Sequence, residues 1–460
     1  MKRYKWLLGC CLFLSIGMLW AADEPDLRML QQKAAQSRDM EGYVGVCKYL
    51  YQTEENPELL LLYADSIHQL ATKSKKPEQL VEYYIWASEG NFIKGDFQQG
   101  YALKRKAIAL AEKAGLKFAI SQSCCDMGYY CNVDARYDSA RYYFRKGLEA
   151  GEDLSEAGEA CRTMLTNYAS SFLFEGKTDS ALVYTIRASE RSAADKDTAM
   201  LIENLNQLGT IYRRKKDLEN CIANFEQALH LCELRGNHNA VAFIYGNIAT
   251  AYCDWNRPGD AIPFSEKAVE YALKTGNKRR IGTCYVNLGA IQTRLVQMRA
   301  EGIATLLKAI PILEEVNDRR LLCDAYNYLV NAYRMDGNLN QAMYYLQKLD
   351  KLAHEMQTDA ERFRYYQAKA GLLQESKKYT EAIVYYRRII DMLRSGYKDT
   401  RDYEHYKRLA DCYLAVNNSS QAYEYLTQAY ALRDSAFHTE QTEQLSEYSV
   451  KYQTKEKELE

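Results

Sequence analysis

The chain has 460 residues, of which 47% are hydrophobic and 26% are charged, and it contains only six prolines. This length exceeds that of a typical single domain, so it predicts several domains or one elongated array. The 60 lysine and arginine residues nearly balance the 61 acidic residues, and no basic stripe is present. We therefore expect no direct contact between residues 1–460 and nucleic acid.

The first 22 residues have the features of a secretory signal. Three basic residues within the first five precede an apolar run from Trp6 to Trp20, and two alanines follow. The run is shorter than the roughly 20 residues that span a bilayer. Residues 1–22 are thus predicted to be a signal peptide and the protein to be exported. The bulky residues before Ala21 leave a retained N-terminal membrane anchor as the alternative.

A period of 40 or 41 residues dominates the rest of the chain. One series of anchor positions, small in most repeats, comprises Ser88, Gly128, Ala169, Gly209, Ala249, Gly289, Val330, Ala370 and Ala410. A second series comprises Ala140, Ala181, Cys221, Ala261, Ala342, Ala382 and Ala422. Small residues that recur in this way predict pairs of antiparallel helices that cross closely, with Phe144 and Phe225 beside the crossing.

Polar residues between the two helices of a pair predict turns. The stretches "RYDSA", "KTDSA", "KKDLENC", "RPGDA" and "KYTEA" place Asp, Thr or Gly at the expected start of each second helix. We expect their side-chain oxygens to cap the free backbone amides there.

The stretches "NLNQLGTIY", "IYGNIATAY" and "CYVNLGAIQ" place an apolar residue before the anchor and usually an aromatic residue after it. In this pattern the chain resembles tetratricopeptide repeat (TPR) proteins with repeats of about 40 residues. The resemblance implies an all-α fold, an α-α superhelical solenoid of tetratricopeptide repeats. Residues 81–434 would form about nine repeats, and residues 23–80 would form degenerate N-terminal helical hairpins. The sequence departs from the family pattern in lacking most of its tryptophans and in an extra residue near Gly302.

Carboxamide side chains recur two positions before the anchor in four consecutive repeats. They could hydrogen-bond successive peptide units of a bound strand, because a carboxamide both donates and accepts. The alternative is that each side chain bonds its own neighbouring helix or turn. The resemblance implies a concave groove lined by the first helices, and nearby arginines would favour an acidic or carboxylate-bearing ligand. The predicted peptide-binding groove comprises Asn167, Gln207, Asn247, Asn287, Arg214, Arg294 and Asn331.

The sequence contains no recognisable catalytic motif. A phosphate loop, a dinucleotide glycine fingerprint, a nucleophile elbow and a zinc-binding His-Glu-x-x-His helix are all missing. We predict that the protein is not an enzyme and has no catalytic residues, cofactor or metal site. Eleven cysteines follow the signal at irregular spacing, and we expect them to be small core residues and not a disulfide framework.

Residues 435–460 are polar and lack Gly and Pro, which predicts a charged C-terminal helix or linker. The spaced residues Leu445, Tyr448, Tyr452 and Leu459 could form a seam with a second chain, giving a homodimer. The alternative is that they pack on the last repeat.

The order of signal, repeats and Lys/Glu-rich end resembles the outer part of certain envelope regulators. In those regulators a membrane-spanning helix and a histidine-kinase or helix-turn-helix module follow. The resemblance implies a non-enzymatic scaffold, periplasmic or inner-membrane associated and facing the periplasm, that binds a peptide or protein segment as a sensor. Its membrane association would come from the retained anchor or from a missing C-terminal segment. The alternative is a stand-alone periplasmic adaptor that organises envelope or polysaccharide-processing proteins.

Overall fold

A computed structural model describes residues 27–434, except residues 54–55, 357, 398 and 400–401. The predicted signal peptide at residues 1–22 and the predicted charged helix or linker at residues 435–460 lie outside the described residues. Within the described ranges all regular structure is helical, which confirms the all-α prediction. No helix in these ranges combines the length and the apolar composition needed to cross a membrane.

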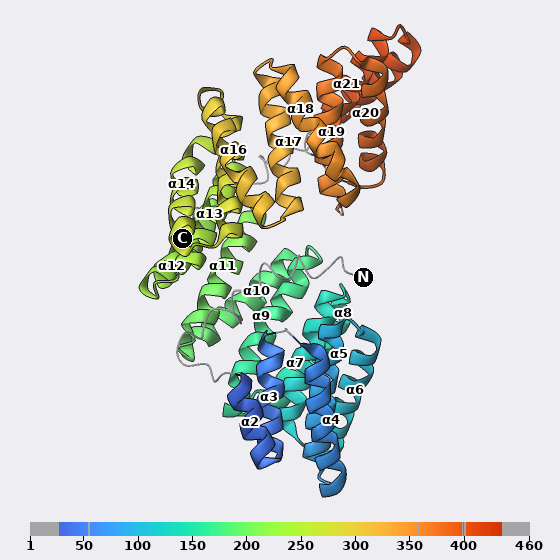
Figure 1. Cartoon of the computed structure of the whole chain (residues 1–460). Helices are drawn as coiled ribbons and strands as arrows, with labels where there is room; N and C mark the ends of the chain where they lie inside the picture. The colour runs from blue at the N-terminus through green and yellow to red at the C-terminus, as the bar shows by residue number, and fades with distance from the viewer. Residues whose placement is uncertain (1–26, 54–55, 357, 398, 400–401, 435–460) are drawn as a thin grey trace, which may run out of the picture. The chain divides into compact units, whose positions relative to one another are not determined.

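The chain divides into two compact units of helical hairpins, and the first ends at Trp255 (Figure 1). Consecutive helices pack against each other throughout this unit. Its helices are α2 (Leu27–Ser37), α3 (Met40–Thr53), α4 (Pro57–Ser74), α5 (Pro77–Lys94), α6 (Phe97–Ala114), α7 (Lys117–Val133), α8 (Tyr137–Gly151), the 3₁₀ turn η1 (Ser155–Ala157), α9 (Gly158–Phe174), α10 (Thr178–Ala194), α11 (Thr198–Arg214), α12 (Leu218–Leu234) and α13 (His238–Asp254).

The second unit begins at Asn256 and repeats the same hairpin plan. Its helices are α14 (Pro258–Thr275), α15 (Lys278–Arg294), the 3₁₀ turn η2 (Val296–Met298), α16 (Arg299–Glu315), α17 (Arg319–Met335), α18 (Leu339–Leu352), the 3₁₀ turn η3 (Ala353–Glu355), α19 (Asp359–Glu375), α20 (Tyr379–Arg394) and α21 (Asp402–Ala415). Residues 419–434 are also helical. The turn η2 takes up the irregular spacing near Gly302, where an added Cβ would lie 2.7 Å from the Thr293 backbone nitrogen.

The small anchor residues mark the places where the two helices of a hairpin cross. A Cβ added at Gly128 would lie 2.3 Å from a ring carbon of Phe144, and a Cβ at Gly289 would lie 2.7 Å from Leu306 Cγ. Both distances are far below ordinary van der Waals contact. Phe144 and Leu306 are fully buried. The sequence interpretation of close crossings beside large side chains is thus confirmed.

The prediction that side-chain oxygens cap the second helices is wrong for four of the five stretches. Asp217 does accept a hydrogen bond from Asn220 N at the start of α12. In the other four stretches a basic residue occupies the N-cap position, and no side-chain hydrogen bond caps the helix: Arg136, Lys177, Arg257 and Lys378. The polar residues of these stretches instead lie within the first turn of the helix, one residue or more past the cap.

The cysteines are core residues, as expected. None of the eleven cysteines in the described ranges forms a disulfide, and ten of them are buried. Burial raises the pKa of the Cys47 and Cys232 thiols to about 12, which keeps these groups protonated at neutral pH.

Candidate functional site

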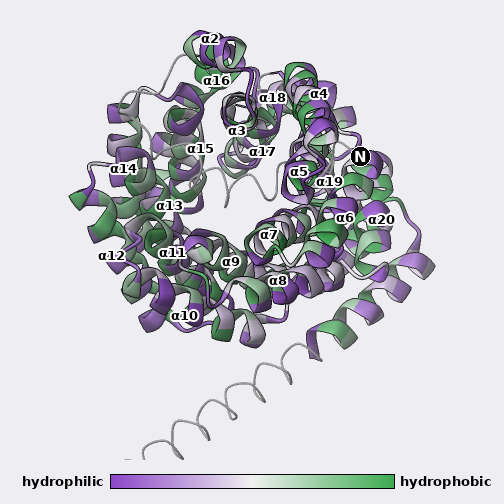
Figure 2. Cartoon of the chain, turned by 90° about the horizontal axis from the view of Figure 1, so that it is seen from below, coloured by the Kyte–Doolittle hydropathy of each residue, from purple (hydrophilic) through white to green (hydrophobic). Residues whose placement is uncertain are grey.

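The helices of the first unit form two layers. In Figure 2 the first helices α7, α9 and α11 lie nearer the centre of the view, and the second helices α8, α10 and α12 lie nearer its edge. The predicted groove residues Asn167, Gln207 and Asn247 belong to α9, α11 and α13, all of which are first helices. We call the surface that these three helices share the first-helix surface.

Two of the predicted carboxamides connect successive first helices. Gln207 Nε2 donates to Ser170 Oγ on α9 at 2.7 Å, and Asn247 Nδ2 donates to Asn206 Oδ1 on α11 at 2.7 Å. Both side chains are half-buried. The alternative anticipated from the sequence, bonding to a neighbouring helix, therefore occurs here, and these bonds also fix the orientation of both amides.

Asn167 has a different environment from Gln207 and Asn247. Its residue is only 2% exposed, and its backbone oxygen accepts a hydrogen bond of 3.0 Å from Asn132 Nδ2 on α7. A ligand on the surface could not contact this side chain in the described conformation. Asn167 is therefore a packing residue between repeats, and the prediction that it lines an open groove is corrected.

The remaining predicted groove residues are distributed over both units. In the first unit Arg214 Nη1 donates to the Leu173 carbonyl at 2.8 Å, at the end of α9. In the second unit Asn331 Nδ2 donates to the Asn327 carbonyl at 3.1 Å within α17. Asn287 and Arg294 are exposed on α15. The structure thus brings Gln207 and Asn247 onto connected helices, and it holds Arg214 and Asn331 by backbone contacts.

A further group on the first-helix surface is Glu203, one helical turn before Gln207 on α11. Burial raises the pKa of this carboxyl to about 8, and the nearby Asp197 adds to the increase. A buried carboxyl group is stable when it is protonated and neutral, or when a cationic group lies beside it. Sequence reasoning missed Glu203, although its spacing of four residues from Gln207 indicated a shared helix face.

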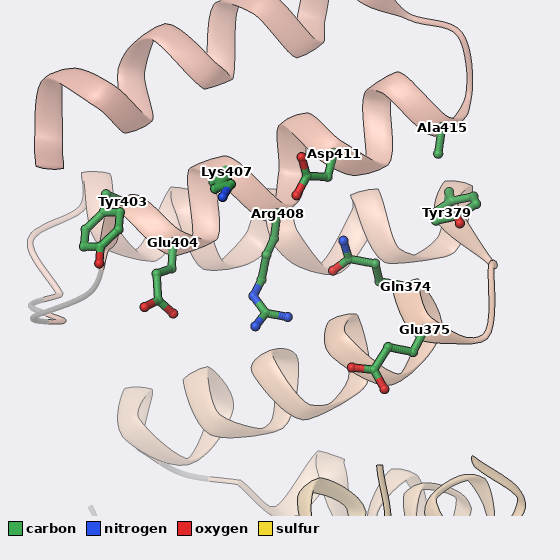
Figure 3. A pocket seen from close by; sticks show the side chains of 9 residues that line it. All are labelled: Gln374, Glu375, Tyr379, Tyr403, Glu404, Lys407, Arg408, Asp411 and Ala415. Carbon is green, nitrogen blue, oxygen red and sulfur yellow. The ribbon is translucent and has the colours of Figure 1, made fainter. Parts of the chain in front are cut away.

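The second unit has a polar pocket of about 720 Å³ between α19 and α21. Figure 3 shows Arg408 and Glu404 projecting from α21 into this space, with Glu375 projecting toward it from α19. Arg334 on α17 pairs with Glu375, and the Tyr386 hydroxyl donates to Gln374 Oε1 at 2.7 Å.

Arg408 lies two positions before the anchor Ala410, the position that Gln207 and Asn247 occupy in their own repeats. It forms no ion pair with a described residue, and it lies beside the Tyr386 hydroxyl. Burial raises the pKa of Tyr386 to about 12, and Arg408 partly offsets this increase. The repeat period could have identified Arg408, but an arginine does not continue a run of carboxamides.

A buried ionic cluster lies where α5, α6 and α7 meet. Lys104 is fully buried, and its Nζ atom contacts Glu89 and also Asp126 Oδ2, the latter at 2.9 Å. The Tyr130 hydroxyl donates to Glu89 Oε2 at 2.6 Å. Burial raises the pKa of Glu89, while Lys104 opposes this effect. The cluster is closed on itself, so it stabilises the packing of three helices and leaves little capacity for a ligand.

The family model for the tetratricopeptide repeat matches residues 200–274. One solved structure of similar fold is a signal transduction ATPase with numerous domains from Pyrococcus horikoshii, which has a tetratricopeptide repeat sensor. It shares 14% identity with this chain at a TM-score of 0.53, and the match covers 83% of this chain and 54% of that one. The chain therefore contains tetratricopeptide repeats. The all-α solenoid of such repeats that the sequence predicted is thereby confirmed.

A second solved structure matches less well. The apo form of the quorum sensor NprR from B. thuringiensis shares 16% identity at a TM-score of 0.49, over 71% of this chain and 92% of that one. No curated protein matches the sequence. A fold does not determine a ligand, so the ligand of this chain is inferred from its own residues.

Proposed function

We propose that this tetratricopeptide-repeat protein is a non-enzymatic scaffold that binds an extended peptide or protein segment on its first-helix surface. The observation that carries the proposal is the pair of oriented carboxamides at Gln207 and Asn247. Each makes a side-chain hydrogen bond to the preceding first helix, and each amide nitrogen has a second hydrogen to donate. A bound backbone can use these hydrogens without reorienting either side chain, which lowers the cost of binding.

The repeat period supports an extended ligand. Gln207 and Asn247 occupy the same position in consecutive repeats, on helices that are in contact. A strand that crosses successive first helices would meet one carboxamide per repeat, and a strand offers a donor or an acceptor at every residue. Glu203 would favour a basic side chain in the ligand near Gln207.

We further propose that the protein is exported and acts as the sensor region of a membrane-associated signal-transduction or transcription regulator. The basic and apolar pattern of residues 1–22 supports export. The repeats of the Pyrococcus horikoshii protein are described as its sensor, which is the role proposed here. Intact mass and membrane fractionation of the native protein test this part. A soluble species lacking residues 1–22 would favour the stand-alone periplasmic adaptor instead.

The binding proposal is tested with a phage-displayed library of random 16-residue peptides selected on the full chain. We expect a class of peptides whose affinity falls at least about tenfold in Asn247→Ala and in Gln207→Ala. Asn224→Ala is the matched control, because Asn224 is a half-buried asparagine on the second helix α12. The proposal would be contradicted if every selected peptide bound the three variants and the unchanged chain with equal affinity.

A further inference from the structure

The second-helix layer of the first unit contains an apolar hollow of about 430 Å³. Glu190 and Ala193 of α10 line one side, and His230 and Leu231 of α12 line the other. The floor comes from the first helix between them, through Leu201 and Leu205 of α11. The hollow therefore lies between two consecutive second helices and is distinct from the first-helix surface.

Exposed apolar side chains extend this hollow on both helices. Ile186 lies one turn before Glu190 on α10 and is 37% exposed, and Val183 is 56% exposed. On α12, Leu234 lies one turn after His230 and is 72% exposed. We call the surface formed by Val183, Ile186, Glu190, His230, Leu231 and Leu234 the α10–α12 surface. Contiguous exposed apolar side chains rimmed by polar ones mark a site of protein interaction more often than isolated ones do.

Charge and spacing indicate the kind of partner. Glu190 is exposed and forms no ion pair with a residue in the described ranges. Leu231 and Leu234 are three residues apart on one face of α12, and the stripe from Gln227 to Leu234 spans about 10 Å at 1.5 Å per residue. This length matches about two turns of a partner helix with apolar residues at i, i+3, i+4 and i+7.

We propose that the α10–α12 surface binds an amphipathic helix of a partner protein. One or two large apolar side chains of that helix enter the hollow, and a lysine or arginine of the helix pairs with Glu190. Leu234 and Ile186 cover the apolar face of the helix on either side of the hollow. This interaction does not depend on the proposed function of the first-helix surface, because the two surfaces belong to different helix layers.

The experiment uses the same library of 16-residue peptides on the full chain, followed by affinity measurements on two variants of the surface. We expect a class of peptides with apolar residues in helical spacing and at least one basic residue. Leu234→Glu should weaken these peptides at least about tenfold, because it places a charge against their apolar face. Glu190→Lys should weaken the same class and favour peptides in which an acidic residue replaces the basic one.

Matched controls separate this binding from other effects. Leu273→Glu on α14 replaces a leucine that is 52% exposed and is not on the surface, so it should leave the affinities unchanged. Circular dichroism of each variant checks that the helices are intact. Asn247→Ala should not affect this class of peptides, so failure here and failure of the first-helix proposal are distinguishable.

Three results would overturn the proposal. The first is a selection in which no peptide depends on both Leu234 and Glu190. The second is an enriched class that depends on them but lacks helical spacing. The third is a dimer of the unchanged chain, seen by light scattering, that Leu234→Glu converts to a monomer, because the surface would then join two copies of this chain.

Discussion

The backbone of Gly209 in α11 packs directly against the ring of Phe225 in α12. A Cβ added at position 209 would lie 2.6 Å from Phe225 Cε1, and Phe225 is fully buried. The ring thus occupies the space that any other side chain at position 209 would need. This contact determines how closely the two helices of the repeat approach each other.

Gly209→Ala is expected to destabilise the protein by about 1–3 kcal/mol, because the ring and the helix must both move to admit one methyl group. Urea denaturation followed by circular dichroism measures the change. The control is Gly246→Ala on α13, where an added Cβ meets nothing within 4 Å. That variant should be neutral or more stable by up to about 1 kcal/mol, since alanine favours the helix. Equal effects at the two sites would contradict the packing argument.

Lys104→Met is expected to cost about 3–5 kcal/mol, because it leaves the buried Glu89 carboxylate without its cation. Adding Glu89→Gln to this variant should recover part of the loss, since the second change removes the uncompensated charge. Lys278→Met is the control, because Lys278 and Glu315 form an exposed ion pair and should contribute less than about 1 kcal/mol. A double variant less stable than Lys104→Met alone would refute this account of the cluster.

The raised pKa of Glu203 predicts a pH-dependent stability. The folded protein keeps the Glu203 proton up to about pH 8, whereas the unfolded chain releases it near the usual glutamate pKa of about 4.3. The free energy of unfolding therefore falls as the pH rises between these values. Glu203→Gln should remove this contribution and be more stable than the unchanged chain at pH 8, with the difference vanishing near pH 4.

Unfolding midpoints in urea at pH 4, 6 and 8 measure that difference. Glu226→Gln on α12, an exposed glutamate of the same repeat, serves as the control and should show no comparable trend. If Glu203→Gln and Glu226→Gln follow the same pH profile, Glu203 is ionised and solvated in the folded protein.

Asp318 combines two contacts that substitution can separate. Its Oδ1 atom accepts from Leu321 N at 3.1 Å and caps α17, and its Oδ2 atom accepts from Arg279 Nε on α15 at 2.8 Å. Asp318→Ala should cost about 1–2 kcal/mol, because it removes the cap and the ion pair together. Asp318→Asn retains a capping oxygen, so most of the stability should remain. If Asp318→Asn proves as unstable as Asp318→Ala, the ion pair contributes more than the cap.

The repeat period could be predicted from the sequence because helix packing requires it. Gly128 and Gly209 must be small wherever Phe144 and Phe225 fill the crossing, so the same constraint returns every 40 or 41 residues. The backbone conformations of the turns were harder to predict from the sequence. Lys216 adopts a left-handed conformation with φ of 57°, a region that glycine or asparagine usually occupies.

The places of the carboxamides on the helices were predictable, but their environments were not. The spacing correctly placed Gln207 and Asn247 at one position of consecutive first helices, yet it could not show that Asn167, at the same position, is buried. Burial depends on the neighbouring helix, and the sequence does not state which side chains meet there. Lys104 was missed for the same reason, since its partners Glu89 and Asp126 are 15 and 22 residues away in the chain.

The junctions between repeats have a consequence for how the chain tolerates rearrangement. Lys196 and Gly236 both adopt left-handed conformations, and each precedes a capping residue, Asp197 or Asn237. Each capping oxygen accepts from the third amide of its helix. An in-frame excision of residues 198–237 would therefore join Asp197 to His238 through a junction of the kind already present. The number of repeats can change by whole units while every remaining turn keeps its geometry.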